Sequence, residues 1–157
     1  MRAVGYGLAA LASMIMASSA SACTLCSCSA STTGISFGGY DPGATGPKDG
    51  AGSVTLSCTG LISLAGTIDI TMSPGSSGTP LARQMTQGAA RLNYNLYTDG
   101  SRTTVWGTGS ASTGIVSATL TGLLSFSQTV SVYGRIPAGQ WVQAGPYADS
   151  VIVTIAY

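Results

Sequence analysis

Residues 53–58 read Ser-Val-Thr-Leu-Ser-Cys, with an apolar side chain at every second position. In an extended chain this alternation places Val54, Leu56 and Cys58 on one face and the hydroxyl side chains on the other. A period of two is typical of a strand with one buried and one solvated face, and such strands usually pair antiparallel. The segment therefore predicts a half-buried strand in an antiparallel sheet.

The same alternation recurs along the chain. Further strands are expected at residues 67–72, 91–96, 129–132 and 150–157. Glycine and proline are concentrated in residues 38–52, 73–80 and 107–114, which hold 11 of the 22 glycines and 4 of the 6 prolines. Short strands separated by glycine-rich turns predict an all-β fold, an immunoglobulin-like antiparallel β-sandwich.

Two local features interrupt this pattern. Asp99-Gly100 lies between two strand-like segments, and both residues tolerate positive φ, so a tight hairpin turn is expected there. Residues 83–90 could form a short helical turn, although Gly88 argues against a longer helix.

The first 22 residues have the features of an export signal. Arg2 provides a positive start, residues 4–20 are apolar, and Ala20-Ser21-Ala22 gives a small-x-small cleavage pattern. We therefore expect a signal peptide at 1–22 and a single domain at 23–157, exported to the periplasm and then to the cell surface or beyond. A competing interpretation is a lipoprotein box with a lipidated Cys23, but such boxes usually carry Leu, Val or Ile at the position of Ala20. No later segment is long and apolar enough to predict a membrane span.

Charge is scarce, and histidine and glutamate are absent. Charged residues make up 7% of the chain, against about 25% in ordinary domains. Without a basic patch, nucleic-acid binding is not expected. Without histidine, no Ser-His-Asp or Cys-His arrangement can be built. We therefore expect no catalytic residue, no cofactor and no metal site, and we interpret the chain as a protein that is not an enzyme.

Four cysteines in an exported chain indicate disulfides, for which three pairings are open. Cys26 and Cys28 lie two residues apart on one extended strand, with Cα atoms roughly 6.6 Å apart, near the upper limit for a disulfide, so a bond between them would be strained. Cys58 faces inward, so a bridge from Cys28 on an N-terminal strand would link two core strands. Cys23 and Cys26 are then left for a second bridge. A redox motif, a metal site or thiols with an intermolecular partner are the alternatives for that pair.

Several segments, taken together in their order along the chain, resemble the pattern of a known family. They are residues 28–31, 35–42, 53–58, 88–99, 102–107, 132–140 (Val-Tyr-Gly-Arg-Ile-Pro-Ala-Gly-Gln) and 145–151. In order and spacing they resemble the spore coat protein U domain family, over nearly all of residues 28–157. The resemblance implies a structural subunit of an archaic chaperone–usher pilus, serving adhesion and biofilm formation, or a related secreted coat protein.

The resemblance also implies partners and a site. Such a pilus subunit is a sandwich that lacks its last strand, which a periplasmic chaperone supplies until the N-terminal extension of another subunit replaces it. An outer-membrane usher and other pilus subunits complete the set of partners. On this chain the implied edge for the chaperone and for strand exchange is the final strand, with Val151, Val153, Ile155 and Tyr157.

One departure from the family pattern leaves alternatives open. Cleavage after Ala22 would leave only residues 23–27 before Cys28, whereas a donor strand needs about ten residues with alternating apolar side chains. The chain could therefore be a tip or adhesin-like module that accepts a strand without giving one. A secreted spore or cell-coat protein that folds alone is the other alternative.

The remaining aromatic and charged residues have ordinary structural interpretations. Phe37, Tyr94, Trp106 and Trp141 are expected to fill the core or to cover its end. Arg91 and Arg135 are expected to pair with Asp69, Asp99 or Asp149. Tyr40-Asp41-Pro42 is expected to form a turn in which the aspartate caps the backbone.

Overall fold

The computed structural model describes residues 26–157. The strands are β1 (Cys26–Thr33), β2 (Lys48–Met72), β3 (Arg83–Gln87), β4 (Ala90–Tyr97), β5 (Val116–Ile136) and β6 (Val153–Ala156). Two short 3-10 turns, Gly75–Ser77 and Pro80–Ala82, precede β3. All ladders between the strands are antiparallel, which confirms the all-β immunoglobulin-like architecture.

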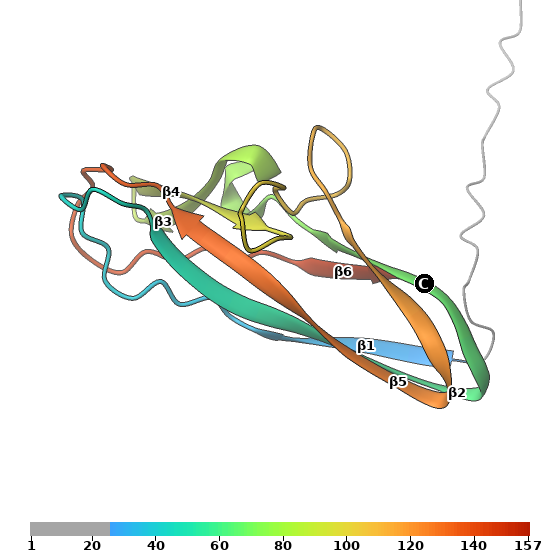
Figure 1. The fold of residues 1–157 in the computed structure, drawn as a ribbon. Coiled ribbons are helices and arrows are strands. Elements are labelled where there is room, and N and C mark those ends of the chain that lie inside the picture. Colours follow the sequence, from blue (N-terminus) through green and yellow to red (C-terminus); the bar gives the residue numbers. More distant parts are fainter. Residues whose placement is uncertain (1–25) are drawn as a thin grey trace, which may run out of the picture.

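The two long strands β2 and β5 build both layers of the sandwich. They pair with each other along most of their length and bend together at one end, so that each returns in the second layer (Figure 1). At the bend the register shifts between Thr59 and Ser63, and Leu124 on β5 has a positive φ of 70°. An irregularity of this kind lets a strand turn a corner without losing its partner.

The other strands attach to the edges of this bent ribbon. β1 pairs with the first half of β2 in one layer, and β6 pairs with residues 69–72 of β2 in the other. On the opposite edge β4 pairs with the last part of β5, and β3 follows β4.

Alternation of side chains fills the space between the layers. Buried apolar side chains include Val54, Leu56, Ile68, Ile70, Leu120 and Trp106. The outward positions of β1, β2 and β5 in the first layer carry hydroxyl side chains, in register from Thr33, Ser53 and Ser131 to Ser27, Thr59 and Ser125. Two cross-strand hydroxyl pairs on this face, Thr33–Ser53 and Thr55–Thr129, are each 2.9 Å apart.

The segment after β1 folds inward over glycines. A Cβ atom added to Gly134 would lie 2.7 Å from the ring of Phe37, and one added to Gly50 would lie 2.8 Å from Ile35. The Phe37 ring also meets Tyr94 edge-on, with ring centroids 6.1 Å apart. Glycine at these two positions therefore gives residues 35–37 room to pack on the sheet.

The predicted strands are largely confirmed, with four corrections. Residues 53–58 and 67–72 are parts of one strand, and the last strand is shorter than expected. The helical turn expected at 83–90 is wrong: Arg83 and Met85 both point into the core, so the segment forms β3. The hairpin near Asp99-Gly100 exists, but Arg102, with φ of 58°, takes the left-handed conformation.

No helix in the described part of the chain is long and apolar enough to cross a membrane.

Candidate functional site

Two strands leave an edge unpaired on the same side of the sandwich. β5 occupies one edge of β2 in both layers, so β1 and β6 both lie along the other edge. Within residues 26–157, no ladder joins the far edge of β1 or of β6. Each of these edges therefore presents backbone N–H and C=O groups that a further strand could pair with.

A groove lies where β1 ends and β6 begins. It encloses about 420 Å³, with Thr32 to Ile35 on one side and residues 147–151 with Val153 on the other. The buried side chains of Val54, Met72, Leu96 and Val132 form its floor.

Several inward-facing side chains beside this groove remain partly or fully exposed. Ala30 and Thr32 have the inward register of Cys28 on β1, yet both are exposed. On the opposite wall Val151, Val153 and Ile155 are only half-buried, although Ile70, paired with Ile155 on β2, is fully buried. The floor of the groove is therefore buried, whereas inward-facing side chains on both of its sides remain partly exposed.

The wall formed by residues 147–153 is fixed by hydrogen bonds. Thr86 and Ala148 exchange two backbone hydrogen bonds, of 2.8 and 3.2 Å. The Ser73 N–H donates to the Ile152 carbonyl at 2.9 Å, and the Ile152 N–H donates to the Ser73 hydroxyl at 2.8 Å. The wall is therefore held in an extended form without a strand on its outer side.

Asp149 connects this wall to the floor. Its carboxylate accepts hydrogen bonds from the Tyr94 hydroxyl at 2.7 Å and from the Ser76 N–H at 3.0 Å. Burial raises the pKa of Tyr94, and the hydrogen bond to Asp149 raises it further. Tyr94 therefore stays a neutral donor throughout the physiological pH range.

Below the groove lies a buried cation. Arg83 is fully buried and donates to the carbonyls of Ser73, Pro80 and Trp106 and to Oδ1 of Asn95. Burial lowers the pKa of Arg83, which the nearby Tyr94 and Asp149 partly offset. Sequence inspection missed this group, because a single arginine in a short polar segment gives no sign of burial.

The disulfide between Cys28 and Cys58 is confirmed. The two residues are direct partners in the ladder between β1 and β2, with Cα atoms 4.1 Å apart. The bond ties the edge strand β1, one wall of the groove, to the core strand β2. The second bridge expected between Cys23 and Cys26 involves a residue outside the described range, as do the signal peptide and the lipidation alternative.

The predicted strand-exchange residues differ in position. Val151 and Val153 line the groove and Ile155 is half-buried beside them, whereas Tyr157 is 37% exposed and is not part of the lining. Their role in strand exchange stays a prediction.

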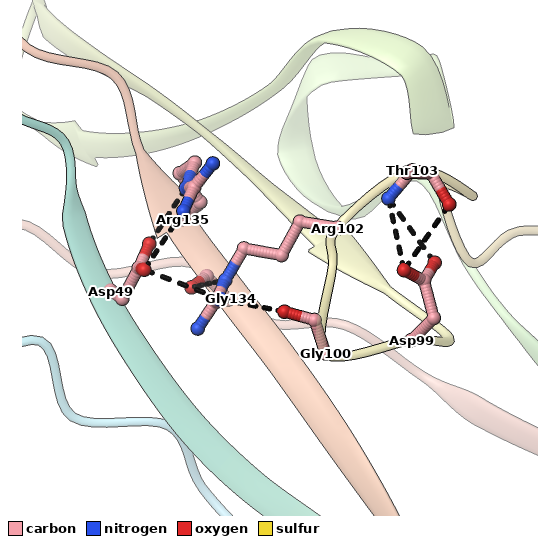
Figure 2. Close-up of polar contacts among 7 residues, drawn as sticks. All are labelled: Asp49, Asp99, Gly100, Arg102, Thr103, Gly134 and Arg135. Carbon is pink, nitrogen blue, oxygen red and sulfur yellow. Dashed lines mark hydrogen bonds and ion pairs between the residues drawn. The ribbon is translucent and has the colours of Figure 1, made fainter.

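The ion pairs expected for Arg91 and Arg135 are wrong. Arg135 donates to Asp49 at 2.7 and 2.9 Å, because the two are direct partners across β2 and β5 (Figure 2). Arg102 approaches the same carboxylate at 3.3 Å and lies over the ring of Tyr133. Among the described residues, Arg91 donates only to the carbonyls of Gly88 and Ala90.

The expectation for the aromatic residues holds for three of them. Trp106 and Tyr94 are buried and Phe37 packs against the core, but Trp141 is 81% exposed, so its expected place in the core is wrong. The expected turn at Tyr40-Asp41-Pro42 is confirmed, since Asp41 Oδ1 accepts the Gly43 N–H at 2.8 Å.

Two surface carboxylates make stability depend on pH. The hydrogen bond from Arg135 lowers the pKa of Asp49 (Figure 2). Backbone hydrogen bonds, first from Thr104, lower the pKa of Asp99. A lowered folded-state pKa adds stability that is complete above about pH 5 and is lost as the pH falls through roughly 4 and below. We expect the double variant Asp49→Asn, Asp99→Asn to lose less stability between these pH values.

The measurement is the urea midpoint at each pH. Asp69→Asn is the control, since it removes a carboxylate and leaves both hydrogen-bonded groups in place. An unchanged pH dependence in the double variant would show that other groups govern the acid response.

Comparisons with known proteins agree with this geometry. The model of the Spore Coat Protein U domain matches residues 13–154. Protein U of Myxococcus xanthus is 35% identical over 136 residues, covering 78% of this chain and 71% of that protein.

A solved structure shares the fold. It is the CsuC–CsuE chaperone–tip adhesion subunit pre-assembly complex from archaic chaperone–usher Csu pili of Acinetobacter baumannii. The match has a TM-score of 0.57 and 18% identity, and covers 85% of this chain but only 40% of the matched chain.

Proposed function

The chain belongs to the Spore Coat Protein U domain family, and on that premise we propose that it is a non-enzymatic subunit of an exported cell-surface fibre. In this proposal the groove between β1 and β6 accepts a β-strand from another polypeptide. A periplasmic chaperone supplies that strand first and another subunit supplies it in the fibre, with an outer-membrane usher guiding assembly.

The groove is the observation that carries the proposal. A strand laid along it would pair with open backbone edges and would cover the half-buried Val151, Val153 and Ile155 with its own alternate side chains. One added element would thus satisfy hydrogen bonding and apolar burial together. The fold shared with a chain of a chaperone–subunit complex supports this interpretation.

A self-folding coat protein is the second candidate. The relationship to Protein U, a member of a family named for the spore coat, favours it. The two candidates make opposite predictions about strand uptake, so one experiment separates them.

We expect the full chain to take up a strand peptide. The probe is a fluorescent synthetic peptide of about ten residues with alternating valine and threonine, long enough to follow the groove. Fluorescence anisotropy measures uptake, and the chain should gain about 2.7 kcal/mol of stability at a peptide concentration of about 100 Kd. Val153→Asp should weaken uptake by roughly a hundredfold, because a carboxylate would be buried under the peptide.

Ile152→Asp is the matched control, since Ile152 is adjacent to Val153 but points outward and is 68% exposed. A second arm leaves the chain unchanged and replaces the central valines of the peptide with glycine, which should abolish uptake. Cooperative unfolding of the chain alone, with no peptide uptake, would refute strand acceptance and support the coat protein.

A further inference from the structure

Residues 35–39, here called the strap, follow β1 and lie between two hydrogen-bonded anchors. On one side the chain leaves the ladder between β1 and β2 at Thr33. On the other side the Tyr40 hydroxyl donates to the Pro137 carbonyl and accepts the Gln140 N–H, both at 2.9 Å. Among the described residues, none is hydrogen-bonded to the strap itself. The strap is therefore held between its anchors by the packing of its side chains.

Two side chains of the strap, those of Ile35 and Phe37, fill a hollow in the sheet. The hollow exists because three neighbouring inward positions are glycines, Gly50 and Gly52 on β2 and Gly134 on β5. A Cβ atom on Gly52 would lie 2.9 Å from Cγ1 of Ile35, and one on Gly134 would lie 2.7 Å from Cζ of Phe37. Both side chains are half-buried, and the residue between them is exposed. The strap thus packs like a short strand, but without a ladder.

The same two side chains stand between two cavities. Ile35 and Phe37 line the groove of about 420 Å³ described above and also line a second cavity of about 620 Å³. The second cavity continues past the strap, where residues 38–42 and 142–147 contribute to its lining and the buried Leu92 lies in its floor. Ile35 and Phe37 therefore form a partition, and the groove ends where they stand.

We propose that Ile35 and Phe37 form a displaceable plug, which an entering strand expels from the glycine hollow so that the two cavities become one continuous groove. Such a plug rests on the proposed function and adds to it a rearrangement of this chain that controls strand uptake. Its departure breaks no hydrogen bond between the strap and the described residues. Beside the plug Gly38 has a φ of 64°, and a Cβ atom there would meet nothing within 4 Å, so the backbone has room to pivot.

The plug lowers the affinity of the groove for a strand. Only molecules with the plug displaced accept a strand along the full length, so the apparent Kd is the intrinsic Kd divided by the fraction of such molecules. The closed state is favoured by the apolar packing of Ile35 and Phe37 on the core. It is also favoured by the edge-on contact of Phe37 with Tyr94, with ring centroids 6.1 Å apart. An entering strand replaces this packing with its own apolar side chains.

Fluorine NMR can follow the plug directly, because the chain contains only two phenylalanines, Phe37 and Phe126. Phe126 also packs against the core but lines neither cavity, so it is an internal reference. The full chain, labelled with fluorophenylalanine, is titrated with the strand peptide of alternating valine and threonine. On uptake the Phe37 resonance should move toward that of fluorophenylalanine in water, while the Phe126 resonance should stay in place.

Emptying the hollow should strengthen strand uptake, although it removes packing from the chain. Phe37→Ala should lower the Kd for the peptide, measured by fluorescence anisotropy, by roughly tenfold, because the open state is then more populated. Phe126→Ala is the matched control, since it removes the same side chain from the core outside the plug. Its Kd should equal that of the wild type.

The outcomes separate the plug from strand acceptance. Uptake accompanied by movement of the Phe37 resonance, with tighter binding by Phe37→Ala alone, supports the plug. Uptake with an unmoved Phe37 resonance, or an unchanged or higher Kd in Phe37→Ala, overturns the plug and leaves strand acceptance intact. If the wild type takes up no peptide, strand acceptance is refuted and the plug fails with it.

Discussion

Replacing Arg83 with methionine is expected to lower the free energy of unfolding by about 3–5 kcal/mol, the cost typical of breaking a buried charged network. Domains of this kind are stabilised by only about 5–15 kcal/mol in total. The variant should therefore unfold at a urea concentration lower by about 2 M, for a slope of about 2 kcal/mol per M.

The expected loss of stability follows from the hydrogen bonds that the Arg83 side chain donates. The guanidinium has five N–H donors, and every one points to a neutral acceptor in the structure: Nε and Nη2 to Ser73, Nη1 to Pro80 and Asn95, and Nη2 also to Trp106. Methionine fills much of the same volume but donates nothing. The carbonyls of Ser73 and Trp106 would then be left in the interior without a donor, at about 1–3 kcal/mol for each such group.

Two further variants separate charge from hydrogen bonding. Arg83→Lys keeps the charge, but a compact ammonium cannot reach acceptors that lie on three sides, so we expect most of the stability loss to persist. Arg91→Met is the matched control, because Arg91 is exposed and, within residues 26–157, its side chain donates only to two nearby carbonyls. Its effect should stay within about 0.5 kcal/mol.

Arg83 also matters for the groove. It anchors Ser73, whose backbone N–H and hydroxyl hold the wall at Ile152. A variant that loses less than about 1 kcal/mol would show that the cost of burying the cation nearly equals what its hydrogen bonds return. In that case the network would specify the position of the wall without stabilising the fold.

The strands of the core were predictable because their side chains alternate. Val54, Leu56 and Cys58 face inward as their spacing requires, and Cys28 pairs with Cys58 because both occupy inward positions of neighbouring strands. The continuity of β2 through residues 60–66 was not predictable. Two strand-like segments joined by glycine and apolar residues look like a hairpin, and only pairing with β5 makes them one bent strand.

Burial of polar groups and exposure of apolar ones escaped the sequence pattern. Nothing in the sequence marked Arg83 as buried, and Trp141 was expected to fill the core or to cover its end, yet Arg83 is fully buried and Trp141 is exposed. In both cases the decisive partners are far along the chain: Trp106 for Arg83, and Asn93 and Tyr40 for the loop that carries Trp141. The same holds for the groove, whose two walls lie more than a hundred residues apart in sequence.

Removing the disulfide by Cys28→Ala together with Cys58→Ala is expected to cost about 3–4 kcal/mol. The bond closes a loop with a sequence separation of 30, and the chain-entropy relation gives roughly this value for such a loop. The thermal midpoint should fall by about 10–15 °C, given a few degrees per kcal/mol for a domain of this size. Alanine is used because Cys58 is buried, and a serine hydroxyl there would lack a partner.

The loss of structural stability in this variant should be concentrated in β1. This strand pairs on one side only, and its inward residues Ala30 and Thr32 are exposed, so little apolar burial holds it in place. Hydrogen exchange should therefore show loss of protection at residues 27–33, while β5 amides that pair with β2 stay protected. A reducing agent should reproduce this loss of protection in the wild type. It should not change the protection of β1 in the double variant, which has no Cys28–Cys58 bond to reduce.

Ser29→Ala with Ser57→Ala is the matched control, since these residues are also direct ladder partners but face solvent and share one hydrogen bond of 3.4 Å. If β1 stayed protected in the cysteine variant, its ladder alone would hold the strand and the bond would be dispensable. The expected outcome instead ties the groove to oxidation, because the disulfide is the covalent attachment of β1 to the core strand β2 and forms only in an oxidising compartment. Strand uptake should then depend on the oxidised chain, because the peptide needs the edges of both β1 and β6.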